Sequence, residues 1–160
     1  MWVIVGKYKQ MFKGISNLSI DVKGRASMPQ RYRKDFSAKN KSKVIITADK
    51  DKCLLIYTQN SWSIIEKKLS ELPSYNKEAR FVQRLLIGYA TESEIDSQGR
   101  FLIPNPLREY AGIQKKIILL GQGNKFELWS ENIWNKNMKS WLVSQNGDDA
   151  KNEALNELKL

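Results

Sequence analysis

Residues 21–33 of this chain read DVKGRASMPQRYR, and residues 96–108 read DSQGRFLIPNPLR. Asp, Gly, Arg, an apolar residue, Pro and a final Arg recur in the same order, each displaced by 75 residues between the two stretches. So many matched positions indicate two copies of one supersecondary unit. Because two copies are too few for a solenoid, we expect two halves that pack around a pseudo-two-fold axis.

Each copy has the local signals of a β-hairpin followed by a short helix. Apolar and polar residues alternate over 18–22, which is typical of a half-buried strand, and Lys23-Gly24 has the composition of a two-residue hairpin loop. A second short strand is expected over 25–28. A short helix is expected over 29–36, because its proline suits the first helical position.

Two more strands and a helix are expected in each copy. The strands are predicted over 44–48, 53–57, 117–120 and 126–129. Amphipathic helical patterns start at Trp62 and Trp134, with Asn60 or Ser61 as the cap of the first helix. A helix over 76–88 joins the two copies. We interpret the tryptophans on these helices as core or subunit-contact residues rather than as a base-stacking platform.

The composition excludes several classes of functional site. The chain has 160 residues, with no His and a single Cys. It therefore cannot supply His metal ligands, a Ser-His-Asp triad, a Cys-His dyad or an internal disulfide. A Walker loop and a Gly-x-Gly-x-x-Gly motif are also missing. We expect that the protein is not an enzyme, holds no metal or cofactor, and takes no small molecule.

The apolar runs are short. The longest, residues 1–5 and 53–57, have five residues each, whereas a membrane span needs about 20. We therefore expect a soluble, intracellular protein without a membrane partner.

Positive charge is concentrated in the first third of the chain. Residues 1–52 carry 13 Lys and Arg against 4 Asp and Glu, whereas the whole chain carries 27 against 17 and a net charge of +10. A localised basic stretch attracts polyanions through phosphate contacts and counterion release. In the second copy, Gln98 and Pro106 replace Lys23 and Arg31. We therefore expect the first copy to face nucleic acid and the second to complete the fold or line an interface.

The Asp and Arg around each hairpin turn allow two interpretations. Asp21 can accept backbone N–H groups of the turn and pair with Arg25 across the hairpin, so that the two charges staple the turn. Alternatively, Arg25 projects toward a phosphate or a base, which a guanidinium grips bidentately. The same two interpretations apply to Asp96 and Arg100.

The repeated motifs also resemble a known family. Together with MFKG at 11–14, KFELW at 125–129 and Trp134, they are similar to the MraZ family of bacterial transcriptional regulators over roughly residues 11–142. The resemblance implies an α+β fold, with duplicated AbrB-like swapped-hairpin modules that form a small β-barrel with flanking helices.

The resemblance also implies how the chain is divided. The modules are expected at 11–72, which faces DNA, and at 76–142. Residues 1–10 are then an extension and residues 143–160 a tail, both expected to be poorly ordered.

The function that the resemblance implies is repression of transcription. The family forms ring-shaped homo-oligomers that bind direct repeats of double-stranded DNA in the promoter of the division and cell-wall gene cluster. This implies a cytoplasmic, nucleoid-associated protein. The family's Asp-x-x-x-Arg motif, associated with DNA contact, maps onto Asp21/Arg25 and Asp96/Arg100. Several identical hairpins on one ring would bind tightly through avidity.

The predicted DNA-binding set combines the basic cluster with the two motifs. Its members are Lys13, Asp21, Lys23, Arg25, Arg31, Arg33, Lys34, Asp96 and Arg100. An RNA-binding module, or a scaffold ring whose basic face meets an acidic protein, would use the same hairpin face. Competition between duplex DNA and single-stranded RNA distinguishes these alternatives.

Overall fold

Strands and helices follow one another in two similar runs. The structure is a computed structural model that describes residues 11–37, 42–144 and 153–158. Its sheet strands are β1 (Phe12–Ser19), β3 (Lys43–Ala48), β4 (Leu54–Thr58), β5 (Thr91–Glu94), β7 (Lys116–Gly123) and β8 (Phe126–Ser130). Two short strands, β2 (Arg25–Ser27) and β6 (Arg100–Leu102), follow the hairpin turns. The expected extension at 1–10, and residues 145–152 and 159–160 of the expected tail, lie outside the described residues.

The helices occupy corresponding places in the two runs. They are the 3-10 helix η1 (Gln30–Phe36), α2 (Gln59–Ser70), α3 (Lys77–Leu86), α4 (Asn105–Tyr110), α5 (Glu131–Ser144) and α6 (Glu153–Asn156). The short helices η1 and α4 follow the two hairpins, and α2 and α5 follow the two later strand pairs. The duplication seen in the sequence is therefore present in the order of the elements.

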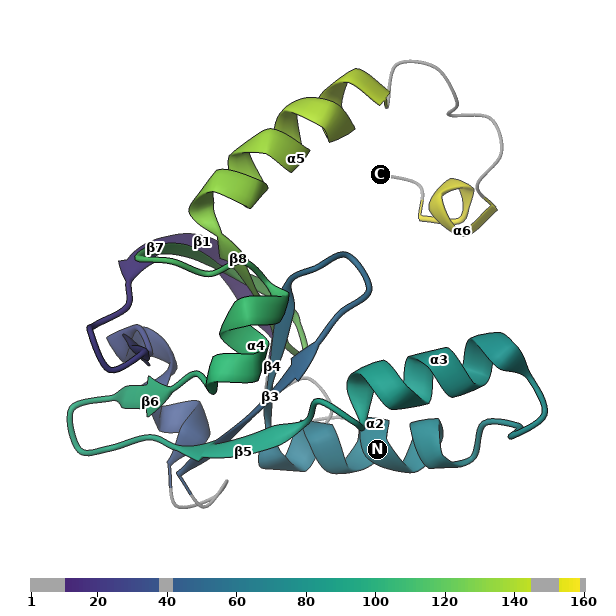
Figure 1. Ribbon diagram of the computed structural model, residues 1–160, viewed down its shortest axis with the longest axis horizontal. Coiled ribbons are helices and arrows are strands. Elements are labelled where there is room, and N and C mark those ends of the chain that lie inside the picture. The colour runs from purple at the N-terminus through teal and green to yellow at the C-terminus, as the bar shows by residue number, and fades with distance from the viewer. Residues whose placement is uncertain (1–10, 38–41, 145–152, 159–160) are drawn as a thin grey trace.

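One antiparallel sheet runs through both copies, with the strand order β1-β7-β8-β4-β3-β5 (Figure 1). Exchanging the corresponding strands of the two copies, β1 for β5, β7 for β3 and β8 for β4, turns this order into its own reverse. This is the two-fold relation expected from the duplication. The copies are interleaved, because β1 of the first pairs with β7 of the second, and β5 of the second pairs with β3 of the first.

The sheet is open, so the expected β-barrel is wrong. Its edges are β1 and β5, which within the described residues pair only with β7 and β3. The strands β2 and β6 do not close the gap, because each has three residues and they pair with each other in a separate ribbon. Pro29 and Pro104 follow soon after and lack the backbone N–H that a longer strand needs. The mixed α/β class is confirmed.

The first glycine turn joins strands of two different sheets, since β1 pairs with β7 and β2 pairs with β6, so the expected hairpin, in which these two strands pair with each other, is wrong. The strand expected over 18–22 is β1, which starts at Phe12 because it pairs residue by residue with β7. The turn then starts at Asp21, whose carbonyl accepts the N–H of Gly24. Gly24 has a φ of +85°, a conformation in which glycine avoids the strain of a side chain. The expected glycine turn is therefore confirmed.

The elements after the first hairpin follow the sequence pattern, with one difference. Both predicted strands are present as β3 and β4, and the helix predicted over 76–88 is α3. The hydroxyl of Thr58 accepts the N–H of Ser61 at 3.1 Å. Thr58 is therefore the cap of α2, and the prediction of Asn60 or Ser61 is wrong. The cap moves because α2 follows β4 directly, without a loop.

An aromatic cluster in the main core joins the two copies. The ring of Phe126 on β8 lies 4.2 Å from that of Phe12 on β1 and 4.9 Å from that of Tyr32 on η1, measured between centroids. Phe36 on η1 stacks on Phe12 at 6.0 Å. All four rings are buried. The hairpin and short helix of the first copy are thereby packed onto a strand of the second.

The β2/β6 ribbon lies on this core by one face. Ala26 and Phe101, which oppose each other across the ribbon, are each buried, as are the following residues Met28 and Ile103. Because side chains alternate between the two faces of a strand, burial of this face directs the other face outward. Figure 1 places both hairpin turns at the left-hand end of the molecule, away from α2 and α3.

The tryptophans of the later helices pack on the sheet, as expected. Trp62 of α2 is buried, with its ring 5.5 Å from that of Tyr57. Trp134 of α5 is half-buried, with its ring 5.8 Å from that of Trp129. Within the described part of the chain, none of these helices combines the length and apolar character that a membrane span requires.

Candidate nucleic-acid interface

A carboxylate organises the turn of the first hairpin. One oxygen of Asp21, Oδ1, accepts the backbone N–H of Lys23 at 3.0 Å and that of Arg25 at 2.9 Å. The other, Oδ2, accepts the side-chain Nε of Arg25 at 2.8 Å. Asp21 therefore fixes both the backbone of the turn and the direction of the arginine side chain.

The turn of the second hairpin has the same geometry. Oδ1 of Asp96 accepts the backbone N–H groups of Gln98 and Arg100, each at 2.9 Å. Oδ2 accepts Nε of Arg100, also at 2.9 Å. The interpretation in which the two charges staple each turn is thus confirmed in both copies. Since the ion pairs engage Nε, they do not use the two terminal nitrogens of either guanidinium.

Both turn carboxylates are held in their charged form. The backbone N–H of Arg25 lowers the pKa of Asp21 below its ordinary value, and the side chain of Arg25 lowers it further. Arg100 has the same two effects on the pKa of Asp96. Because these pKa values are lowered, the carboxylates stabilise the turns above the ordinary carboxyl range. That contribution is lost as the pH falls through the lowered pKa values.

The register of the ribbon brings the two arginines to one surface. Arg25 pairs with Leu102, and Arg100 pairs with Ser27, on either side of the buried Ala26 and Phe101. The four flanking side chains therefore share the outer face, with the arginines at diagonal positions. The side chain of Arg25 is 28% exposed and that of Arg100 is 33% exposed. Neither guanidinium lies in a sealed core.

This juxtaposition differs from the division of labour expected from the sequence. The two arginines are 75 residues apart in the chain, and only the pairing of β2 with β6 shows that they face the same way. The exposed Leu102, 46% accessible, belongs to the same face and was not among the predicted site residues. The sequence places Leu102 two residues after Arg100, and side chains two apart on a strand share a face. Leu102 could therefore have been assigned to the face of Arg100.

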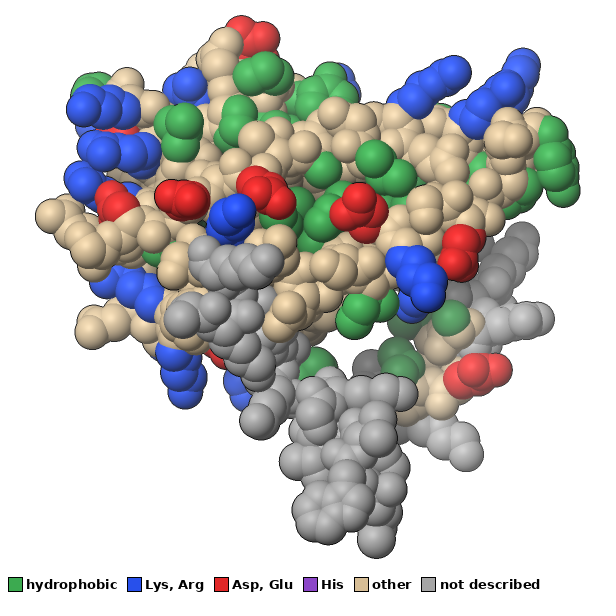
Figure 2. Space-filling model, turned by 90° about the horizontal axis from the view of Figure 1, so that it is seen from below, with side chains coloured by type: hydrophobic (Ala, Val, Ile, Leu, Met, Phe, Trp, Pro, Cys, Tyr) green, Lys and Arg blue, Asp and Glu red, His purple; other side chains and the backbone are tan. Residues whose placement is uncertain are grey.

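The other predicted basic residues are exposed, with one exception. Lys13 on β1, Lys23 in the first turn and Lys34 on η1 are exposed. Arg31 on η1 is also exposed, donates to Oγ of Ser16 at 2.9 Å, and lies over the ring of Tyr32. Figure 2 shows Lys and Arg side chains gathered at the left-hand end of the molecule, with some acidic side chains among them. Both hairpin turns lie at this end in Figure 1.

The exception is Arg33, which is half-buried. Its Nε donates to the carbonyl oxygen of Met28 at 2.9 Å, and its guanidinium lies against Gly99 in the turn of the other copy. The structure therefore places Arg33 inside the packing of the hairpins, unlike Lys34 beside it in the sequence.

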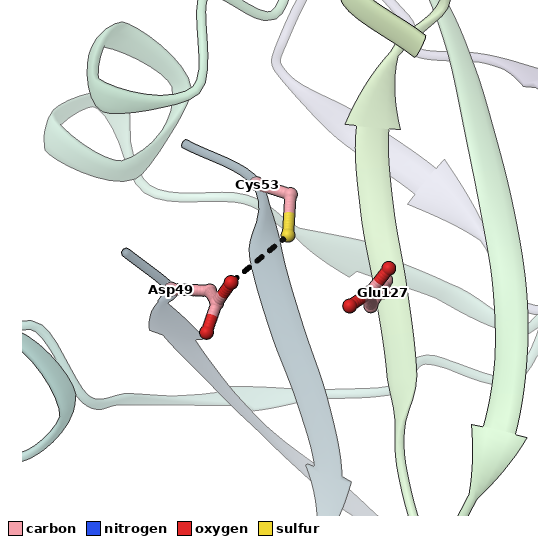
Figure 3. Close-up of side chains that lie close together, drawn as sticks. All are labelled: Asp49, Cys53 and Glu127. Carbon is pink, nitrogen blue, oxygen red and sulfur yellow. Dashed lines mark hydrogen bonds between the residues drawn. The ribbon is translucent and has the colours of Figure 1, made fainter. Parts of the chain in front are cut away.

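A second cluster of polar groups lies among Asp49, Cys53 and Glu127 (Figure 3). Within the described residues, their thiol and carboxylate atoms form the one group of three potential metal ligands, all within 4.8 Å of one another. Burial and the nearby carboxylates raise the pKa of the Cys53 thiol, which donates to Oδ2 of Asp49 at 3.8 Å. Burial also raises the pKa of Glu127, which accepts Nε1 of Trp129 at 3.0 Å.

These shifts make Cys53 and Glu127 harder to ionise than the free side chains. The contacts that the structure shows for them are the hydrogen bonds from Cys53 to Asp49 and from Trp129 to Glu127.

Comparison with known proteins gives consistent matches along the chain. A family model described as "MraZ protein, putative antitoxin-like" matches residues 11–85 and again residues 86–156. A protein of Thioalkalivibrio sulfidiphilus is 45% identical over 150 residues, which are 94% of this chain and 100% of the relative. A protein of Coxiella burnetii is 46% identical over 142 residues, which are 87% of this chain and 93% of the relative. Both relatives are named "Transcriptional regulator MraZ".

Proposed function

Since this chain belongs to the MraZ family, we propose that it is a transcriptional regulator that binds double-stranded DNA through the outer face of its β2/β6 ribbon. The observation that carries this proposal is the register of the ribbon. It directs Arg25 and Arg100, one from each copy, to the same exposed face. The second motif is then part of the DNA-binding surface rather than only a structural counterpart of the first.

The chemistry of this face suits DNA. A two-stranded β-ribbon fits the major groove, where a guanidinium can bind guanine bidentately and an apolar side chain can contact the thymine methyl group. Arg25 and Arg100 keep their terminal nitrogens clear of the ion pairs with the turn carboxylates. Leu102, opposite Arg25 and two residues after Arg100, is the apolar group on the same face.

The remaining predicted residues have supporting roles. Lys13, Lys23, Arg31 and Lys34 are exposed and supply phosphate contacts, which give affinity without reading sequence. Asp21 and Asp96 do not approach the DNA as ligands. Instead, each orients its arginine through the bond to Nε.

We propose further that the two modules, 11–72 and 76–142, are AbrB-like swapped hairpins. The pairing supports this, since the first strand of each hairpin lies beside a strand of the other copy. The chain would assemble as a ring homo-oligomer, with exposed apolar side chains such as Trp141, Leu142 and Val143 of α5 available for subunit contacts.

Such a ring explains how a small ribbon could bind tightly. One ribbon contacts few phosphates, but several ribbons engage direct repeats at matching spacing, and each later contact is intramolecular. We propose that the repeats lie in the promoter of the division and cell-wall gene cluster. Binding there would repress transcription by occupying the promoter, in the cytoplasm at the nucleoid.

A salt-titrated competition experiment tests the proposed function. The full chain is mixed with duplex DNA from upstream of its own gene, with scrambled duplex, and with single-stranded RNA of the same sequence. We expect the protein to bind the upstream duplex most tightly, with the logarithm of its affinity falling linearly with the logarithm of the salt concentration, at a slope of about 0.9 per phosphate contact. Tighter binding to the RNA would support the RNA-binding alternative. Failure to bind any of the three nucleic acids would support the scaffold.

A further inference from the structure

The two arginines that end the duplicated motif each reach across to the hairpin of the other copy. A methyl group added at Gly99 would lie 2.3 Å from Nε of Arg33 and 2.5 Å from its Cζ. A methyl group added at Gly24 would lie 2.6 Å from Cζ of Arg108 and 2.7 Å from its Nη1. Each guanidinium therefore rests directly on a turn glycine that belongs to the opposite module.

Both glycines are needed for two reasons. Gly24 and Gly99 have φ values of +85° and +81°, where other residues are strained. They also leave the space that the guanidinium of Arg108 or Arg33 fills. A side chain at either position would displace the arginine as well as strain the turn.

We propose that Arg33 and Arg108 are positioning residues for the proposed DNA-binding face, each holding the hairpin turn of the other copy. Arg33 holds the turn that presents Arg100, and Arg108 holds the turn that presents Arg25. This proposal rests on the proposed function for its consequence, but the crossed contacts themselves are a property of the free protein.

The surroundings of these arginines fit a holding role better than a phosphate contact. Arg33 is half-buried and bonded to the carbonyl of Met28. It lines a cleft of about 160 Å³ together with Asp96 and Gly99 of the opposite turn. Nε of Arg108 is buried and has no hydrogen-bond partner in the described structure. Its guanidinium instead packs against Gly24.

Each hairpin turn is held by an arginine of the other copy, so the two halves of the DNA-binding face depend on each other. Arg25 and Arg100 lie on one ribbon, whose diagonal spacing is set by the register of β2 and β6. The turns before these strands are held by helices of the other copy, η1 through Arg33 and α4 through Arg108. A change in one module is therefore expected to appear at the DNA-binding turn of the other.

Amide hydrogen exchange on the free, full-length protein tests this crossed arrangement. Arg33→Met is expected to speed exchange several-fold at Gln98, Gly99 and Arg100, and to leave Lys23, Gly24 and Arg25 unchanged. Arg108→Met is expected to do the opposite. Arg80→Met, at an exposed position of α3, is the matched control and should change neither turn. Faster exchange at the turn of the same copy, or at neither turn, would overturn the proposal.

DNA binding distinguishes holding from direct contact. Arg33→Met is expected to weaken duplex binding with an unchanged salt slope, whereas loss of a phosphate contact would reduce the slope by about 0.9. Arg33→Lys keeps the charge but lacks the planar guanidinium, so it should restore neither turn protection nor affinity. Full restoration by Lys would contradict the proposal. If each variant speeds exchange at the turn of the other copy but the unaltered protein does not bind duplex DNA, the positioning contacts are supported and the proposed function fails.

Discussion

Replacing both Arg25 and Arg100 by Ala is expected to lower the affinity for the upstream duplex by about 30-fold or more while the protein stays folded. A good bidentate contact to a base contributes about 1–3 kcal/mol, so two lost contacts cost about 2–6 kcal/mol. The fold should survive because the two side chains lie on the outer face of the ribbon, and partly exposed ion pairs such as theirs contribute little stability. Salt-titrated binding and thermal unfolding of the variant measure the two effects.

The single variants identify which copies take part. Arg25→Ala and Arg100→Ala should each weaken binding to the upstream duplex and reduce its preference over scrambled duplex, as the loss of a base contact does. Arg80→Ala removes an equal charge from α3 and should bind as the unaltered protein does. If Arg100→Ala alone had no effect, the second copy would not belong to the interface. Binding by the double variant at full affinity would refute the assignment of the ribbon.

Phe126→Ala is expected to destabilise the protein by about 3–5 kcal/mol, the usual cost of removing a buried phenylalanine. Its ring is fully buried between those of Phe12 and Tyr32, so the cavity would open between the two copies. A typical domain has about 5–15 kcal/mol of stability in total, so the variant should unfold at much lower urea concentration.

A matched variant separates the effect of losing buried packing from the effect of removing a phenylalanine ring as such. Phe81 lies on α3 and is 54% exposed, and Phe81→Ala should change the free energy of unfolding by about 0.5 kcal/mol or less. Urea unfolding of both variants gives the comparison. A loss below about 1 kcal/mol for Phe126→Ala would show that the two copies do not share this core.

The duplication could be predicted because both copies keep the residues that their turns require. Asp21 and Gly24 recur as Asp96 and Gly99, and the structure shows why. In each turn the carboxylate binds two backbone N–H groups, and the glycine adopts a positive φ. These are local requirements, and local sequence is enough to reveal them.

The open sheet and the shared arginine face could not be predicted in the same way. Strands of three residues carry no periodicity, and the pairing of β2 with β6 joins segments 75 residues apart. The sequence therefore indicates two separate hairpins, and the more basic one is the natural candidate for DNA contact. The positions of Pro29 and Pro104 were the available signal that these strands stop before they could close a barrel.

Arg33 shows how charge counting misleads at one position. In the sequence it is one of several basic residues near the first hairpin, so it was assigned to the DNA. The distinguishing signal is internal: Arg33 recurs as Arg108, whereas Lys23 and Arg31 are replaced in the second copy. Arg25 also recurs, as Arg100, so recurrence marks a position with a role in both copies, and the structure shows that for Arg33 and Arg108 this role is packing on the opposite turn.

Hydrogen exchange with and without the upstream duplex tests the central claim most directly. Bound DNA is expected to protect residues 23–27 and 98–102 together, since both arginines lie on one face of the ribbon, and to leave α2 and α3 unchanged. Protection of one hairpin without the other, or protection confined to α2 and α3, would contradict a shared DNA-binding face built from both copies.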